Sequence, residues 1–204
     1  MFTDANPYFS VPHNFAVYLS PWPEDKPLPS ESSLRAMQSQ GMQLLTEAKA
    51  LEAHCLLQLR QLDNEAKAVV DFLKIQSRKV DLVLQYVLER EHQQGDKYIG
   101  MQFGGSGLVI ATPAPLPIGS QHQLMLYIHD ELVAILCIAS VSSSVEAAPV
   151  APINGDTPAP CWHTRLDFSQ ILDADVEQLV KASLNVQQKQ LKQRKQAREQ
   201  AGQE

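Results

Sequence analysis

The feature that most constrains this chain is the segment from Glu31 to Gln93, which contains no proline and repeats apolar residues at helical spacing. Alternating steps of three and four residues place these side chains on one seam, which is the pattern of a coiled coil. The seam consists of Leu59, Leu62, Ala66, Val69, Leu73, Gln76, Val80, Val83 and Val87, and backward extension adds Leu45, Ala48 and Cys55. As one helix, about 60 residues would extend roughly 90 Å, at ~1.5 Å per residue. We therefore expect this helix either to bend or to find partner helices.

The apolar stripe on this helix is wider than a two-stranded coiled coil can bury. The positions that flank the seam hold further apolar residues, which are Val70, Phe72, Leu84 and Tyr86. In a dimer these side chains would stay in water. The width of the stripe thus favours a homo-oligomer of three or more helices.

Two positions in the helical segment qualify this prediction. Gln76 lies on the seam, where it is either a tolerated polar residue or one that fixes the register and number of the helices. Gly41 weakens a helix by ~1 kcal/mol relative to alanine, which suggests a hinge between a short first helix and the long one. Ser30, Ser32 or Ser33 can provide the N-cap of the first helix.

Short strands occupy the remainder of the chain. "NFAVYLSPW" precedes the helical segment, and "GLVIAT", "HQLMLYIH", "ELVAILCIASVSSSV" and "CWHTRLDFS" follow it, separated by turn-forming sequences. This order predicts antiparallel strands that close as a sandwich or a small barrel. The first strand must pair with a later one, and "EAAPVAPINGDTPAP" reads as a mobile loop without secondary structure.

A terminal helix is predicted after Asp173, which we expect to cap it, with an apolar face formed by Val176, Leu179, Val180 and Leu184. We expect the basic sequence beyond Val186 to be a solvated or fraying helical tail. The predicted segments are an N-terminal strand with a proline-rich turn at 1–30, a helical insertion at 31–95, a domain of strands and helix at 96–185, and the tail at 186–204.

Composition limits the classes of function. A net charge of −6 argues against nucleic acid as the main partner, and no apolar run is long enough to span a membrane. The cysteines are three in number and far apart, which is typical of a reduced, cytoplasmic protein. No Ser/His/Asp set, carboxylate pair or complete set of metal ligands stands out, so we expect neither an enzyme nor a metal site.

The sequence "FGGSGL" offers one candidate ligand site. Gly104, Gly105 and Gly107, together with Ser106, can present backbone N–H groups to an anion such as phosphate. The alternative interpretation is that the glycines permit a bulge or a sharp bend where a strand enters the fold.

The order of elements resembles the PilZ domain family. The hairpin "PLPIGSQHQLML" follows the Gly-bearing strand, and "RLDFSQILDADVEQL" leads from a strand into the last helix. The resemblance implies an α+β fold, in which a small antiparallel β-barrel carries a C-terminal helix. A long heptad helix inserted after the first strand resembles the atypical, tetrameric branch of this family.

Many PilZ domains bind cyclic di-GMP, and the resemblance implies this ligand and a cytoplasmic, bacterial setting. The family's motif D/N-x-S-x-x-G aligns on Gly107, but it places Gln102 and Gly104 at the Asp/Asn and Ser positions, and no R-x-x-x-R precedes the first strand. An arginine of a neighbouring subunit, such as Arg90 or Arg194, would have to complete such a site.

Three hypotheses follow. The first is a receptor or adaptor in cyclic di-GMP signalling that controls processes such as motility through protein contacts. The second is an oligomeric scaffold that displays several barrels without a small ligand. The third is an enzyme whose site is not visible in the sequence.

Overall fold

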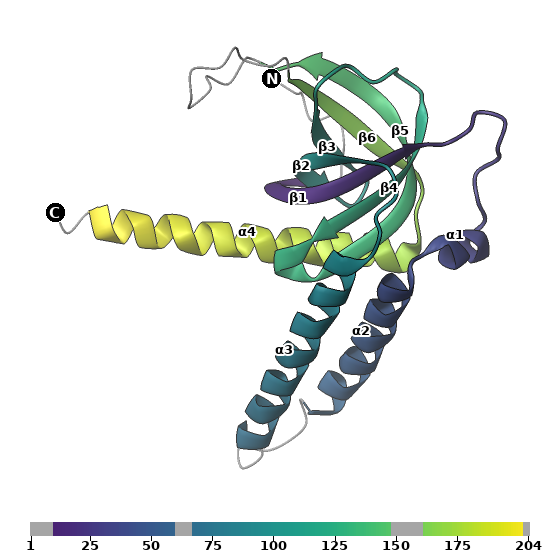
Figure 1. Ribbon diagram of the computed structural model, residues 1–204. Coiled ribbons are helices and arrows are strands. Elements are labelled where there is room, and N and C mark those ends of the chain that lie inside the picture. The colour runs from purple at the N-terminus through teal and green to yellow at the C-terminus, as the bar shows by residue number, and fades with distance from the viewer. Residues whose placement is uncertain (1–9, 60–66, 148–160, 202–204) are drawn as a thin grey trace. The chain divides into compact units, whose positions relative to one another are not determined.

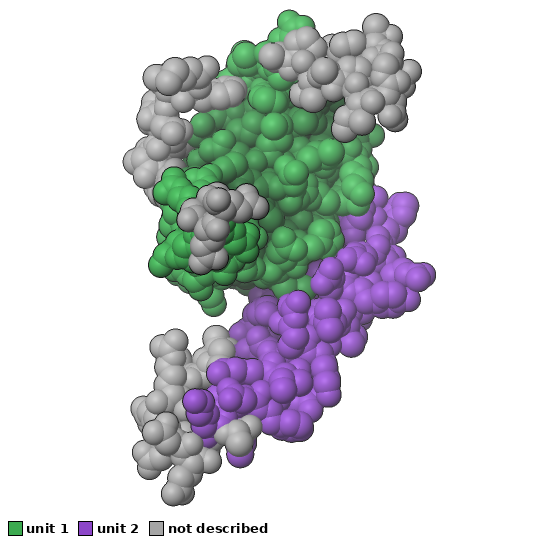
Figure 2. All heavy atoms as spheres, turned by 90° about the vertical axis from the view of Figure 1, so that its left-hand side faces the viewer, with its two compact units in different colours: residues 1–35, 94–204 green, residues 36–93 purple. Residues whose placement is uncertain are grey.

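A computed structural model describes residues 10–59, 67–147 and 161–201, except for the side chains of residues 53–59, 68 and 201 (Figure 1). The chain divides into two compact units, one formed by Met1–Arg35 with Gln94–Glu204 and the other by Ala36–Gln93 (Figure 2). We call them the barrel unit and the helical unit. Their boundaries differ by a few residues from those of the predicted insertion at 31–95.

The barrel unit is built on six antiparallel strands that close into a barrel in the order β1-β2-β3-β6-β5-β4. The strands are β1 (Ser10–Pro21), β2 (Asp96–Gly104), β3 (Gly107–Thr112), β4 (Gln121–Ile128), β5 (Val133–Glu146) and β6 (Trp162–Gln170). β1 pairs with both β2 and β4, as the sequence required of a first strand. The sequence predicted either a sandwich or a small barrel, and the strands form the small barrel.

The barrel interior is filled by apolar side chains that alternate along the strands. Val17, Phe103, Ile110 and Leu124 are fully buried in this core. Phe15 packs edge-on against Phe103, with ring centroids 5.5 Å apart. This packing explains the glycine opposite Phe15 on β2, since a side chain at that position would overlap the Phe15 ring.

Helix α4 (Asp173–Ala201) runs along the barrel and past its edge toward the C-terminus (Figure 1). It packs against β1, β2, β5 and the short helix η2 (His129–Glu131). The side chains buried there are Leu179, Ala182 and Val186.

Two predictions for α4 need correction. Asp173 is its first residue and not its cap, since the carbonyl of Leu172 accepts the first hydrogen bonds from the N–H groups of residues 175 and 176. Val180 and Leu184, expected on the buried face, are 41% and 47% exposed, because the barrel contacts the neighbouring side of the helix. The basic segment, predicted as a solvated or fraying helix, is helical to residue 201 and exposed over residues 191–200, and Lys189 Nζ lies 2.6 Å from Glu131 Oε1.

Helix α1 (Glu31–Met37) follows β1 and its turn. Of the three serines proposed as its N-cap, Ser30 occupies that position. Its Oγ accepts a hydrogen bond from the N–H of Ser33 at 3.3 Å. The helical unit then contains α2 (Gln40–Leu59) and α3 (Lys67–Arg90). Bonds from Gly41 to Glu91 and from Lys49 to Asp81 show that α2 and α3 are antiparallel.

The predicted α+β fold, with a helical insertion after the first strand, is therefore confirmed. The insertion consists of two helices packed on each other and not of one long helix. The sequence did not reveal this break, because the heptad spacing is the same on both helices. The hinge predicted at Gly41 lies close to the observed break between the first two helices, since α1 ends at Met37 and α2 begins at Gln40.

Several predictions lie outside the described residues. They concern Leu62 and Ala66 of the seam, the side chains of Cys55 and Leu59, most of the loop "EAAPVAPINGDTPAP", and residues 1–9 and 202–204.

Candidate functional site

The Gly-rich sequence forms the turn between β2 and β3, and its three glycines are buried. A Cβ atom on Gly105 would lie 3.0 Å from Val180 Cγ2 of α4, and one on Gly107 would overlap the carbonyl oxygen of Leu166 on β6. The carbonyl of Ser106 accepts a hydrogen bond from the N–H of Phe168 at 2.9 Å. This close packing favours the interpretation that the glycines permit a bend. A ligand-binding role for Gly104, Gly105, Ser106 and Gly107 stays a prediction.

An ion pair on β6 lies beside this turn. Asp167 is the residue opposite Gly107 in the β3–β6 ladder, and Arg165 Nε lies 3.1 Å from its Oδ1. Arg165 is thus an arginine close to the start of β3, where the resemblance to PilZ domains predicts a ligand. The neighbouring carboxylate already binds its guanidinium and would repel a phosphate. The pair itself is local, because residues i and i+2 share one face of a strand, but its position beside Gly107 is set by the β3–β6 register, which joins residues far apart in the chain.

The other residues of the predicted ligand motif are engaged elsewhere. Gln102 Nε2 donates to Ser10 Oγ at 2.5 Å, which ties β2 to β1. Arg90 belongs to the helical unit, where its guanidinium carbon lies 5.0 Å from the centre of the Tyr86 ring. A ligand-binding role for Arg90 stays a prediction.

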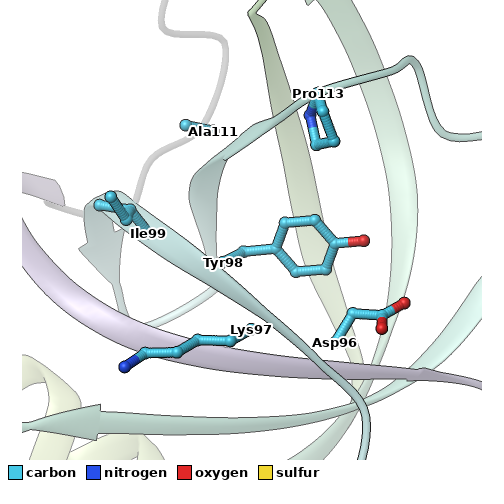
Figure 3. Close-up of a pocket in the computed structure, with 6 residues that line it drawn as sticks. All are labelled: Asp96, Lys97, Tyr98, Ile99, Ala111 and Pro113. Carbon is cyan, nitrogen blue, oxygen red and sulfur yellow. The ribbon is translucent and has the colours of Figure 1, made fainter.

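A separate pocket of about 740 Å³ lies at the opposite end of β2 from the Gly-rich turn (Figure 3). Its lining is formed by Asp96, Lys97, Tyr98 and Ile99 of β2, with Ala111 and Pro113. Burial, together with the charge of Asp96, raises the pKa of the Tyr98 phenol, so the group stays a protonated hydrogen-bond donor. The pocket is open and shallow, and it brings together no nucleophile with a base.

The largest group of exposed apolar side chains among the described residues is on α3. Eight large apolar residues of α3 are exposed, and we call them the α3 outer face: Val69, Phe72, Leu73, Ile75, Val80, Leu82, Val83 and Tyr86. At 100° per residue they cover about half of the helix circumference. Phe72 is 57% exposed and Val83 is 62% exposed. Gln76 and Val87, also on the predicted seam, are half-buried.

The side of α3 that faces α2 carries polar contacts. Lys49 Nζ lies 3.0 Å from Asp81 Oδ1, and Ser77 donates a hydrogen bond to Glu52. Ser77 and Asp81 are half-buried at these contacts, whereas the eight residues of the α3 outer face are exposed. Soluble monomers rarely expose contiguous apolar surface of this extent, so the α3 outer face is a candidate interface.

The sequence matches no protein-family model and no curated protein. Among solved structures, the chain is similar to a PilZ-domain protein of Xanthomonas campestris, with 14% identity over 91% of each chain and a TM-score of 0.51. That protein is described as a tetramer that self-assembles through a helical bundle.

Two further structures match over about half of the chain. The PilZ domain of Escherichia coli YcgR, solved with c-di-GMP, has 13% identity over 48% of this chain and 77% of that chain, with a TM-score of 0.40. MrkH of K. pneumonia, solved in its apo state, has 12% identity over 48% and 43%, with a TM-score of 0.41.

The X. campestris comparison, with its high coverage, establishes a PilZ-like fold for this chain. No helix among the described residues is long and apolar enough to cross a membrane.

Proposed function

We propose that this chain is a signalling adaptor that assembles with copies of itself through the α3 outer face and displays several PilZ-like barrels at once. The observation that carries the proposal is the exposure of eight large apolar side chains on one side of α3. Burial of each such side chain is worth about 1.5–3 kcal/mol. Leaving all eight in water is costly, and association of equivalent helices removes that cost.

The occupant we propose for this face is α3 of other copies of the chain. A bundle of three or more helices buries a stripe of this width, whereas a two-stranded coil does not. The X. campestris neighbour, which matches over nearly the whole chain, assembles as a tetramer through a helical bundle. We therefore propose four copies as the assembled state.

Assembly would give the barrels their function as binding modules. Several barrels on one scaffold bind a partner that has repeated sites with far higher avidity than one barrel does. Such an adaptor requires no small ligand, which agrees with the packed glycine turn and with the carboxylate of Asp167 beside it.

A substitution pair tests this proposal. Val80→Asp with Val83→Asp places two carboxylates in the α3 outer face, and light scattering of a dilute sample at high salt, where contacts between exposed charges are screened, should then report the monomer mass of 22.7 kDa. Arg78→Asp is the matched control, because it changes the net charge by the same amount on an exposed side of α3 that lies outside this face. If the double variant keeps the mass of the parent, the proposal is wrong.

The second candidate function is a cyclic di-GMP receptor, which the PilZ resemblance implies. Arg165 is the observation in its favour, since it supplies one guanidinium next to Gly107. Such a receptor needs further cations, and Arg90 or Arg194 of a neighbouring copy would have to supply them. Calorimetry with this dinucleotide, described below, separates the two functions.

A further inference from the structure

Helix α4 carries a second exposed stripe, which borders the barrel where Val180 lies beside Gly105 of the Gly-rich turn. Val180, Leu184 and Leu191 are 41%, 47% and 56% exposed. They belong to a run with alternating steps of four and three residues, which we call the α4 outer stripe: Asp173, Glu177, Val180, Leu184, Gln187, Leu191, Arg194 and Arg198. This is the spacing of a helix that pairs with another helix.

The charges on this stripe are segregated along the helix. Its first two positions are acidic, its middle is apolar apart from Gln187, and its last two are basic. The four charged side chains are exposed, and none of them has an ion-pair partner among the described residues of its own chain. A stripe ordered in this way is complementary to itself when it is reversed.

We propose that two copies of the chain pair through the α4 outer stripe, with their α4 helices antiparallel. One register of the two helices gives each of the eight residues of the stripe a partner on the second copy. It sets Asp173 against Arg198 of the second copy, Glu177 against its Arg194, Val180 against its Leu191 and Leu184 against its Gln187. Two-fold symmetry repeats each contact, as in other isologous dimers.

The residues at the edges of the stripe agree with this register. Lys181 lies beside Gln188 of the second copy, and Lys195 lies beside its Ala174, so no like charges meet. A parallel pair would instead set each arginine against its own equivalent and each carboxylate against another carboxylate. Antiparallel alignment also opposes the two helix dipoles favourably.

A second copy fits this stripe better than an anionic surface does. A membrane or an acidic polymer would attract Arg194 and Arg198 but repel Asp173 and Glu177 on the same face. The stripe has only three apolar residues to insert into lipid. Only a partner with the opposite order of charges matches its whole length, which is about 37 Å at ~1.5 Å per residue.

The contact should be weak and sensitive to salt, because it is one helix pair held by exposed charges. It is distinct from the α3 outer face and does not depend on the proposed function. A chain that has both contacts would join assemblies built on α3 into larger ones, since an isologous contact links exactly two copies at each α4.

Charge reversal tests the proposal in a chain that also carries Val80→Asp and Val83→Asp. In sedimentation equilibrium at low salt we expect this parent to form a dimer reversibly. Glu177→Arg alone and Arg194→Glu alone should each weaken the dimer by at least about tenfold. The double reversal exchanges the two charges and should restore it. All these positions are exposed, so the fold should persist.

A parent that is monomeric at every concentration would overturn the proposal, and so would a dimer that the single reversals leave unchanged. Failure of the double reversal to restore association would do the same. A monomeric parent that binds vesicles rich in anionic lipid would assign the stripe to a membrane surface instead.

Disulfide trapping in the chain with an intact α3 gives a result that does not depend on the α3 contact. The native residues Cys55, Cys137 and Cys161 are first replaced. Val180→Cys with Leu191→Cys should then give covalent dimers on oxidation, while either cysteine alone should not. Within one helix these positions are about 16 Å apart, too far to bridge. Crosslinks in the single variants would indicate parallel helices and contradict the proposal.

Discussion

The carboxylate of Glu91 accepts a hydrogen bond from the backbone N–H of Gly41 at 2.6 Å, and so caps the first turn of α2 from the residue that follows α3. Its other oxygen accepts a bond from Ser39 Oγ, also at 2.6 Å, and Ser39 Oγ in turn accepts from the N–H of Met42. A Cβ atom on Gly41 would lie 2.7 Å from Glu91 Oε1. The absence of a side chain at Gly41 therefore lets the Glu91 carboxylate approach the N-terminus of α2. A negative charge at a helix N-terminus is stabilising.

Replacing Glu91 by glutamine should destabilise the helical unit. The amide keeps one acceptor but loses the charge that interacts with the first turn of α2, so we expect a loss of about 1 kcal/mol. Denaturant unfolding followed by circular dichroism measures it. Glu47→Gln removes the same charge at an exposed position of α2 and should change stability little. Equal effects of the two substitutions would contradict the capping role.

Substitutions in the Gly-rich turn should differ sharply in cost. Alanine at Gly107 would press its methyl group into the main-chain carbonyl of Leu166, which cannot move without disturbing β6. Overpacking of this kind typically costs 1–3 kcal/mol, and we expect about that loss in thermal or denaturant unfolding.

Gly105→Ala is the matched control, since its methyl group meets only the ends of side chains, Val180 Cγ2 at 3.0 Å and Val176 Cγ1 at 3.7 Å. The Val180 side chain can shift by a few tenths of an ångström, so the loss should be smaller. A Gly107→Ala protein as stable as Gly105→Ala would show that the turn is not packed against β6 as described.

Asp175 is buried at the start of α4, and its Oδ2 has no hydrogen-bond partner among the described residues. Burial raises its pKa from 3.8 to about 6, while the positive charge of Arg35 acts in the opposite direction. Because the folded state then binds this proton more tightly than the unfolded state, stability should fall as the pH rises from about 4 to about 6, and level off above that.

Asp175→Asn should remove this slope and stabilise the protein at neutral pH. A shift of about two units corresponds to at most roughly 3 kcal/mol, at 1.36 kcal/mol per unit. Chemical unfolding at a series of pH values measures the effect, with the exposed Asp173→Asn as control. If the two variants keep the same pH dependence as the parent, the carboxyl of Asp175 is not the group responsible.

Cyclic di-GMP binding tests whether the barrel unit kept a ligand site. We expect isothermal titration calorimetry of the unmodified protein to detect no tight binding, because Asp167 holds Arg165 and repels phosphate. Asp167→Asn removes that repulsion and should give detectable, salt-sensitive heat, whereas Asp167→Asn with Arg165→Ala should not. Micromolar binding by the unmodified protein would favour the receptor over the ligand-free adaptor.

Local sequence patterns predicted five of the six strands and missed only β2 as a strand of its own. "GLVIAT" coincides with β3, and "HQLMLYIH" and "CWHTRLDFS" overlap β4 and β6 closely, because alternation and turn residues are local signals. The order of these strands and the following helix also supported the resemblance to PilZ domains, which the X. campestris structure matches in fold.

The helical insertion was harder to predict from sequence. Heptad spacing reports which side of a helix is apolar, but not where one helix ends and an antiparallel one begins, since Val69 to Val87 continue the spacing of the residues before them. The sequence also could not indicate that Ser77 and Asp81 would contact α2 while eight large apolar residues of α3 stay exposed.

The candidate site was limited by strand register. Gly107 was singled out from the sequence, but the position of the Arg165–Asp167 pair beside it depends on the β3–β6 ladder. In the same way, the contact of Gly105 with Val180 depends on how α4 lies on the barrel. Such non-local pairings carry no local sequence signal.

The most direct test of the proposed function is the mass of the unmodified chain in solution, measured by multi-angle light scattering over a wide range of concentrations. Self-assembly through the α3 outer face predicts a species whose mass is a whole multiple of 22.7 kDa, with four copies as the expected number, that persists on dilution. A mass of 22.7 kDa at every concentration would contradict the account, because the apolar face of α3 would then remain in water without a partner copy.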